Sequence, residues 1–346
     1  MAKVLLLSSV SKGDTTFPPF AREDLDRLRR CADKDVYKVH SIVDDPYEAD
    51  LIIFVERRHA VGKYLEHLRK NPILRQFWDK SLICNSRYTG VPFVPGIYGC
   101  VRRGDCLFPT RIKSGHYTEI YDKPHIAYDP QATERPYLYS FMGAVSTWPV
   151  VREPLSRLKH PRGLFVDTSK IKGEVQAEGK DSERNRYHGR YVDVINQSKF
   201  VLCPRGDAPA SMRLFEAMKM GRVPVVISDE YVYPEGPRWD AFSVHVAEKD
   251  IASIPSLLES LEGRAEEMGE LARQEYEKWF AEEVYFHHVV EWCLDIQRKR
   301  TKADALLQYA EYCKVLRPYQ LRRFASAQYW KVVKRKETLH PAGAKA

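Results

Sequence analysis

The sequence predicts an α/β protein with two Rossmann-like domains that face each other across a cleft. Two observations predict this fold class. Apolar runs typical of buried strands alternate with amphipathic stretches typical of helices along most of the 346 residues. The alternation breaks between Tyr88 and Pro136, where Gly, Pro, Tyr and charged residues dominate, as expected of loops and a domain connection.

The first half supplies four predicted strands and two predicted helices. The strands are "AKVLLLSS", "VYKVHSIV", "EADLIIFVE" and "KSLICNS", and the helices are "REDLDRLRRCA" and "GKYLEHLRKNPILRQFW". The near-continuous apolar run "LIIFV" is typical of a parallel strand that is buried on both faces. We expect this first domain to span residues 1–130.

The second half repeats the alternation. Strands are predicted in "RPYLYSFMGAV", "GLFVDTS", "KFVLCPRG", "RVPVVISD" and "FSVHVAEKD", with helices between and after them. We expect a second domain over residues 131–310 and a basic helix or tail over residues 311–346. Ligands of such domains bind outside the carboxyl ends of the strands.

Positive charge is concentrated at the C-terminal end. The formal net charge is +8, but residues 297–346 hold 13 Lys/Arg against 3 Asp/Glu, so the rest of the chain is slightly acidic. This asymmetry predicts a polyanionic partner, namely a membrane surface, an anionic glycan or a nucleic acid. A solvated tail is the alternative. The stretch "FASAQYWKVVKRK" mixes aromatic and basic residues as interfacial segments do.

The sequence lacks the patterns of membrane-spanning, secreted and zinc-binding proteins. No apolar run is long enough to span a bilayer, and "MAKVLLLSSV" lacks the cleavage pattern of a signal peptide. The seven cysteines show no zinc-site spacing. We therefore expect a cytoplasmic protein with free thiols, peripheral at the inner face of a membrane.

The usual nucleotide and metal motifs are also missing. The sequence holds no G-x-G-x-x-G, no G-x-x-x-x-G-K-[ST] and no G-x-S-x-G. D-x-D occurs at Asp24–Asp26 on a helical pattern and at Asp33–Asp35 before a strand. Neither follows an apolar strand, so we predict no metal site and no cofactor.

One stretch, "KFVLCPRGDAPASMRLFEAMKMGRVPVVISD", carries charged residues around a strand–loop–helix–strand frame. Arg205 and Gly206 follow the strand, and Ser211 is a predicted helix N-cap. Arg213 and Glu216 share the helix face opposite the apolar one. The helix N-terminus and two arginines suit a diphosphate, whereas Glu216 suits hydroxyl groups of a ribose or sugar. A surface Arg–Glu pair is the alternative.

This stretch resembles the signature of the exostosin family of glycosyltransferases (GT47 type). The family shows S-K-F-x-L-C-P-x-G, S-x-R-x-x-E-A and G-x-x-P-V-x-x-S-D, which match Ser198–Gly206, Ser211–Ala217 and Gly221–Asp229. "LYSFMGAVSTWPVVREPL", "RWDAFSVHV" and "DPYEADLIIFV" are similar to further family segments. The clear similarity runs from about Tyr137 to Val246.

The resemblance implies a GT-B fold and an inverting, metal-independent enzyme whose donor is a nucleotide-diphosphate sugar, most simply a UDP-sugar. The residues it implies for nucleotide binding are Gly143, Arg152, Arg205, Gly206, Ser211, Arg213 and Glu216. Animal members are membrane-anchored and disulfide-bonded, unlike the pattern here. The acceptor and the exact donor sugar therefore do not follow from the resemblance.

An inverting transfer needs a group on the acceptor side that removes the proton of the attacking hydroxyl. Three candidates follow N-terminal strands: Asp14 in "SSVSKGD", and Glu56 and His59 in "FVERRHA". Glu56 comes directly after an apolar run, whereas His59 lies farther into the loop. A solvated loop residue is the alternative for each.

The sequence thus predicts a hexosyl- or pentosyltransferase of polysaccharide biosynthesis, acting on a glycan or a lipid-linked glycan. Two other functions stay open. One is a glycosyltransferase that modifies nucleic acid, with the basic end tracking phosphates. The other is a non-catalytic scaffold that binds nucleotide sugars, although the intact set of Arg205, Arg213 and Glu216 argues against it.

Overall fold

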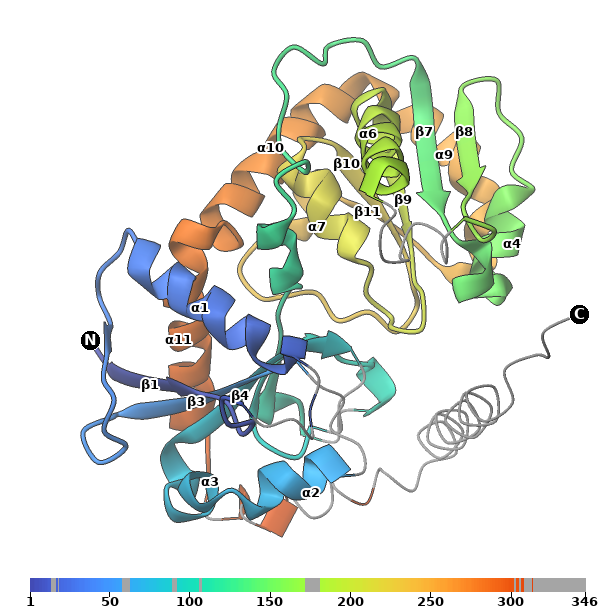
Figure 1. Ribbon diagram of the computed structural model, residues 1–346. Coiled ribbons are helices and arrows are strands. Elements are labelled where there is room, and N and C mark those ends of the chain that lie inside the picture. Colours follow the sequence, from blue (N-terminus) through green and yellow to red (C-terminus); the bar gives the residue numbers. More distant parts are fainter. Residues whose placement is uncertain are drawn as a thin grey trace, which may run out of the picture.

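The computed structural model places most of the chain in two domains, one above the other in Figure 1. The described residues are 1–13, 17, 19–57, 63–88, 92–105, 108–171, 181–301, 303–304, 306–307 and 313. The helices are α1 (Glu23–Lys34), α2 (Lys63–Lys70), α3 (Pro72–Gln76), α4 (Pro149–Ser156), α6 (Asp181–Asn196), α7 (Met212–Lys219), α8 (Trp239–Phe242), α9 (Ile254–Leu261), α10 (Ala265–Trp279) and α11 (Glu282–Arg298). Short 3-10 helices are Pro19–Arg22, Trp78–Lys80, Arg103–Asp105, Pro109–Arg111, Thr118–Asp122, Val145–Thr147, Glu248–Ser253 and Glu262–Arg264.

The first domain is a parallel sheet of six strands in the order β2-β1-β3-β4-β5-β6. Its strands are β1 (Lys3–Leu7), β2 (Ser41–Ile42), β3 (Leu51–Glu56), β4 (Ser81–Tyr88), β5 (Gly96–Cys100) and β6 (Ile112–Ser114). All residues of β3 are buried, as the run "LIIFV" predicts. Alternate residues face opposite sides: Ile53 packs toward α1 and α11, whereas Ile52 packs toward α2 and α3.

The second domain is a parallel sheet of five strands in the order β11-β10-β9-β7-β8. Its strands are β7 (Tyr137–Gly143), β8 (Gly163–Asp167), β9 (Ser198–Pro204), β10 (Val223–Ile227) and β11 (Val244–Val246). In β9, Val201 and Cys203 face α6 and α7, while Phe200 and Leu202 face α4 and α9. Helices therefore cover both faces, as parallel sheets require.

Both sheets reverse their strand order at one place. The reversal lies between β1 and β3 in the first sheet and between β7 and β9 in the second. Connections leave such neighbouring strands in opposite directions, which opens a crevice at their carboxyl ends. The arrowhead of β7 points toward the first domain in Figure 1. Two facing Rossmann-like domains are the GT-B architecture, so the predicted fold class is confirmed.

Two strands, β5 and β6, occupy the region in which the sequence predicted only loops and a connection. The glycines that suggested loops serve close strand packing instead. A Cβ on Gly96 would lie 2.1 Å from the carbonyl oxygen of Ile83, and one on Gly99 would lie 2.5 Å from that of Ser86. Every residue of β5 is buried. Glycine is therefore needed for β5 to approach β4.

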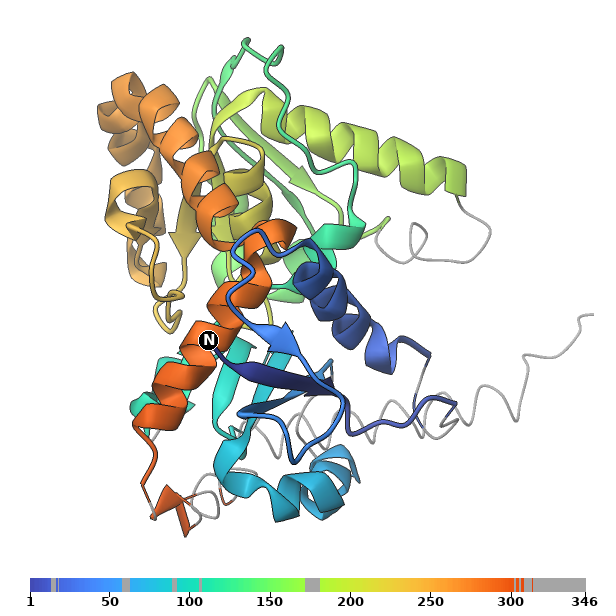
Figure 2. The same ribbon diagram turned by 90° about the vertical axis from the view of Figure 1, so that its left-hand side faces the viewer.

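Helix α11 returns from the second domain to the first, as Figures 1 and 2 show in orange. Although it falls within the residues expected for the second domain, it packs on α1 and β5. Glu282 at its start binds Arg30 at 3.1 Å and Lys34 at 2.5 Å, and the Val36 N–H donates to the Glu283 carbonyl at 3.0 Å. The first domain is thus assembled from two separate parts of the chain.

A buried histidine fills the joint between the domains. The ring of His116 contacts Tyr121, Phe215, Phe280 and Tyr285, with centroid distances of 5.3, 5.4, 5.3 and 4.2 Å. Neither ring nitrogen has a hydrogen-bond partner among the described residues. Phe215 comes from α7 and Tyr285 from α11, so this one side chain joins helices of both domains. No helix in the described ranges has both the length and the apolar character to cross a membrane.

Candidate functional site

Three arginines gather at the carboxyl ends of β7 and β9, where the strand order of the second sheet reverses. Arg152 comes from α4, Arg205 directly follows β9, and Arg213 lies in the first turn of α7. This edge is the expected ligand-binding edge of a parallel sheet. The structure thus brings together three residues that the sequence predicted to bind a nucleotide.

Arg152 ties the two strand ends together. Its Nη1 donates to the carbonyl of Ala144 at 2.7 Å, Nε to that of Arg205 at 3.0 Å, and Nη2 to that of Pro204 at 3.4 Å. Burial first, and the charge of Arg213 second, lower the pKa of Arg152 to about 9. An anion bound beside these two cations would offset their mutual repulsion.

Arg213 lies against the end of β7. Its Nη2 donates to the Met142 carbonyl at 2.7 Å, and its guanidinium stacks 4.6 Å from the centre of the Phe141 ring. A Cβ on Gly143 would lie 2.7 Å from that Nη2, so a larger residue at this position would displace the guanidinium of Arg213. Within the described chain, Nε of Arg213 has no hydrogen-bond partner. Gly143 and Arg213 therefore form one unit.

The loop into α7 is shaped by Gly206 and Ser211. A Cβ on Gly206 would lie 3.3 Å from Nη2 of Arg152. Ser211 has the extended N-cap backbone (φ −122°, ψ 130°), but its hydroxyl forms no capping hydrogen bond within the described residues. The first amides of α7 therefore lack a side-chain partner and keep the positive potential of a helix N-terminus.

Arg205 already holds two carboxylates. Its Nη1 donates to Glu230 at 2.7 Å and to Glu248 at 3.4 Å, and its guanidinium stacks 4.6 Å from the centre of the Trp148 ring. The phosphate-binding role predicted for Arg205 stays a prediction, and these carboxylates compete with it. Glu230 directly follows the quoted motif and could have been noticed there, whereas nothing in the sequence pointed to Glu248.

Glu216 is buried, with 4% of its surface exposed, and both of its oxygens are bound. Oε1 accepts from Nζ of Lys123 at 2.5 Å, and Oε2 accepts from the Tyr191 hydroxyl at 2.5 Å. Burial alone would raise the pKa of Glu216, but the charge and hydrogen bond of Lys123 and the hydrogen bond of Tyr191 outweigh it, so the pKa is lowered. A ligand hydroxyl at Glu216 would have to share these partners.

On the first domain, Glu56 ends β3 at the strand-order reversal of the sheet. Only 1% of its surface is exposed. Oε1 accepts from the Ser9 N–H at 2.6 Å, and Oε2 accepts from the Ser8 hydroxyl at 3.3 Å. The other two candidate bases, Asp14 and His59, lie outside the described residues.

The two domains touch beside these sites. Arg102 forms an antiparallel bridge with Tyr231, and the Ala210 N–H donates to Sγ of Cys100 at 3.1 Å. The carboxyl end of β5 therefore abuts the loop between β9 and α7. This contact brings the carboxyl edge of the first sheet to the loop that carries Arg205.

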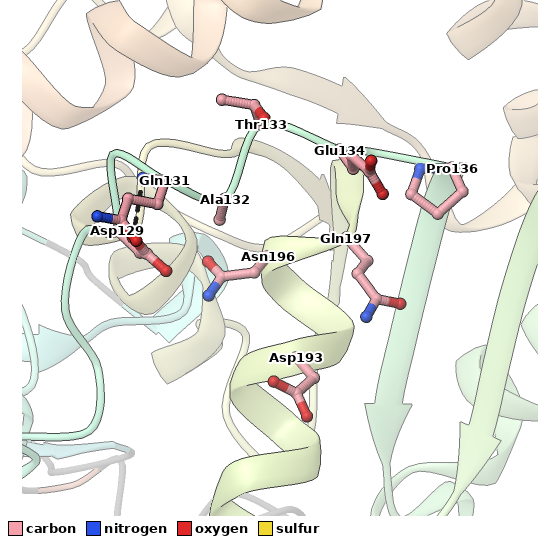
Figure 3. Close-up of a pocket in the computed structure, with 9 residues that line it drawn as sticks. All are labelled: Asp129, Gln131, Ala132, Thr133, Glu134, Pro136, Asp193, Asn196 and Gln197. Carbon is pink, nitrogen blue, oxygen red and sulfur yellow. Dashed lines mark hydrogen bonds between the residues drawn. The ribbon is translucent and has the colours of Figure 1, made fainter.

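A separate hollow of about 530 Å³ lies at the opposite edge of the second sheet, beside the starts of β7 and β9 (Figure 3). It is lined by Asp129, Gln131, Ala132, Thr133, Glu134, Pro136, Asp193, Asn196 and Gln197. Three carboxylates and no cationic side chain line it, so it would repel a diphosphate.

Among the described residues, no group of three or more His, Cys, Asp and Glu side chains could hold a metal ion.

Comparison with known proteins identifies the domain. Residues 114–261 match the model of the Exostosin GT47 domain. The Exostosin-1 homolog of Caenorhabditis elegans is 32% identical over 159 residues, which are 42% of this chain and 41% of the relative. The "Probable glucuronosyltransferase Os01g0926700" of Oryza sativa subsp. japonica is 35% identical over 124 residues, 31% of this chain and 30% of the relative. The chain thus spans less than half the length of these relatives.

Solved structures give weaker overlaps. A glycosyltransferase from Rickettsia africae ESF-5 has a TM-score of 0.38 at 12% identity, covering 86% of this chain and 99% of that one. Anabaena Alr3699/HepE in complex with UDP has a TM-score of 0.36 at 9% identity, with the same coverage. These TM-scores are too low to carry an argument about the fold, which is assigned from the strand order of the two sheets. The three motifs lie within the matched residues, so the resemblance of residues 114–261 to the exostosin GT47 domain is confirmed.

Proposed function

We propose that this protein is an inverting, metal-independent glycosyltransferase. Its donor is a nucleotide-diphosphate sugar, with a UDP-sugar preferred, and its acceptor is a glycan or a lipid-linked glycan. The observation that carries the proposal is the cluster of Arg152, Arg205 and Arg213 at the carboxyl ends of β7 and β9, inside the GT47 domain. The relatives named as glucuronosyltransferases and as a "Probable beta-1,4-xylosyltransferase" support transfer of a sugar.

The cluster suits the departure of a diphosphate. As the bond between the sugar C1 and the diphosphate oxygen breaks, negative charge grows on the leaving group. In this proposal Arg213 and the N-terminal amides of α7 stabilise that charge, and the hydrogen bonds of Arg152 to the strand ends support them. Fixed cations can thus supply the charge that a metal ion supplies elsewhere. The acceptor hydroxyl attacks C1 from the opposite face, which is the side of the first domain.

The proposed setting is cytoplasmic, at the inner face of a membrane. The basic residues of 297–346 would hold the protein on anionic lipid or glycan, with nucleic acid as the other polyanion. Apart from Cys313, residues 308–346 lie outside the described chain, so this docking is proposed from charge alone.

Nucleoside diphosphates are expected to stabilise the protein without added divalent metal. At a hundred times its dissociation constant, a bound diphosphate adds about 2.7 kcal/mol to the free energy of unfolding. The measurement is thermal unfolding with a panel of nucleoside diphosphates and sugar nucleotides, with and without chelator. Stabilisation that disappears in chelator for every ligand contradicts metal independence. A panel without any stabilising ligand contradicts donor binding. Transfer to glycan acceptors, with the product anomer assigned by NMR, then tests inversion.

Glu216→Gln is expected to weaken donor binding by about 10- to 150-fold, because a charge-assisted hydrogen bond contributes about 1.5–3 kcal/mol. The amide keeps the shape but not the charge that a donor hydroxyl would meet. The remaining turnover should keep its pH profile, since Glu216 stands on the nucleotide side. Donor affinity and turnover at saturating donor are measured for Glu216→Gln and for the exposed control Glu277→Gln. Unchanged affinity with abolished turnover would make Glu216 catalytic.

A further inference from the structure

We propose that Ser8 and Glu56 form a proton relay for the acceptor hydroxyl. The acceptor O–H passes its proton to Oγ of Ser8, while Ser8 passes its own proton to Oε2 of Glu56. The inference rests on the proposed glycosyl transfer and names the residue that touches the acceptor. Ser8 was not among the residues that the sequence suggested.

Ser8 and Glu56 lie at the edge of the first sheet where a parallel sheet is expected to bind a ligand. Ser8 directly follows β1 and Glu56 ends β3, and these strands flank the reversal of strand order. The register pairs Leu7 with Phe54, so the two chain ends leave the sheet side by side. Such a crevice is the counterpart of the arginine cluster on the second sheet.

Ser8 is more exposed than Glu56, and this difference assigns them different roles in the relay. Glu56 exposes 1% of its surface and Ser9 exposes 5%, whereas Ser8 is partly exposed. An acceptor sugar can therefore reach the hydroxyl of Ser8 more readily than the carboxylate beneath it. A relay through Ser8 lets the buried carboxylate take the proton without direct contact with the sugar.

Hydrogen bonds orient the Ser8 hydroxyl for this task. It donates to Oε2 of Glu56 at 3.3 Å and accepts from the Val10 N–H at 3.2 Å. A hydroxyl has one donor and two acceptor sites. With the donor directed at Glu56 and one acceptor site used by Val10, the second acceptor site suits an incoming acceptor O–H.

The neighbouring loop holds the carboxylate in place. The Ser9 N–H binds Oε1 of Glu56 at 2.6 Å, and the Ser9 carbonyl lies 2.7 Å from Nε2 of His67. Oε2 is the oxygen that accepts the Ser8 hydroxyl, so it is the oxygen to which Ser8 passes its proton. In the complete step, the acceptor oxygen forms a bond to C1 and the C1–diphosphate bond breaks. The electron pair leaves with the diphosphate, and the acceptor proton ends on Glu56.

The test compares Ser8→Ala, Ser8→Thr, Glu56→Gln and the double variant Ser8→Ala/Glu56→Gln with the wild type. Ser11→Ala is the matched control, since Ser11 is exposed in the same loop. We expect Ser8→Ala and Glu56→Gln each to lower turnover at saturating donor by about 10²–10⁴-fold. Ser8→Thr should retain most of the activity. The double variant should be no slower than the single ones, because the residues act as one unit.

Binding and folding are followed separately. Stabilisation by UDP should be the same in all variants, which shows that each is folded and binds the nucleotide. Ser8→Ala turnover within twofold of wild type overturns the relay. A slow Glu56→Gln beside a normal Ser8→Ala would make Glu56 the direct base, and independent, multiplying losses would also overturn the relay. A wild-type protein that transfers no sugar to any acceptor instead overturns the proposed function, and the relay with it.

Discussion

Arg213→Ala is expected to weaken the binding of a nucleoside diphosphate by about 10- to 150-fold, with the fold intact. This change in affinity corresponds to the roughly 1.5–3 kcal/mol that one charge-assisted hydrogen bond contributes. Arg213 lies beneath Gly143 and against Phe141, and Gly143 leaves room for its guanidinium. The substitution removes this cation from the switch point of the second sheet. Isothermal titration of UDP into both proteins gives the two dissociation constants.

Two further variants make the result specific. Arg157→Ala removes an arginine of 78% side-chain exposure just after α4, and it should leave UDP affinity unchanged. Arg213→Lys keeps the charge but cannot reproduce the planar fork, so an intermediate loss is expected. If Arg213→Ala bound UDP as tightly as the wild type, the arginine cluster could not be the diphosphate site.

Acid is expected to destabilise the protein through His116 by about 1.4 kcal/mol per pH unit between pH 6.5 and the folded-state pKa. Burial lowers the pKa of His116 to about 3, whereas an unfolded histidine titrates near its ordinary value of 6.5. Between these values the unfolded chain binds a proton that the folded protein excludes, so stability falls as the pH falls. At pH 4.5 the loss from this one residue is about 2.7 kcal/mol.

His116→Phe isolates this effect, since the ring already lies among aromatic side chains of Phe215, Phe280 and Tyr285. Urea unfolding at pH 7.0 and 4.5 gives the free energy of unfolding for wild type, His116→Phe and the control His160→Gln. The phenylalanine variant should lose less stability on acidification than the other two proteins. An equal loss in all three would assign the acid sensitivity to other groups.

The sequence predicted those parts of the site that depend on local pattern. β3 and β9 were visible as apolar runs, and α7 was visible from its apolar face. The strand–loop–helix pattern predicted that Arg205 and Arg213 would lie close together at the carboxyl edge of the sheet. Arg152 was expected there only from the exostosin resemblance. The exostosin resemblance of this region is confirmed by the match of residues 114–261 to the GT47 domain.

The partners of these residues were not predictable, because they depend on contacts between distant segments. Lys123 lies 93 positions from Glu216, and Ser8 lies 48 positions from Glu56. Residues this far apart produce no periodic pattern in the sequence that would predict their contact. The strands β5 and β6 were missed for another reason: glycines that permit close strand packing resemble loop glycines in the sequence.

The return of α11 to the first sheet has a consequence for the order of folding during synthesis. The ribosome releases all of β1–β6 early, but the helix that packs on α1 and β5 emerges only after residue 298. By then residues 137–279 have already emerged and can fold. We therefore expect the second domain to complete its fold before the first, the reverse of the usual N-terminal-first order. Until synthesis passes α11, the apolar side chains it covers stay open to chaperones, and a nascent chain stalled at residue 281 carries an unfinished first domain.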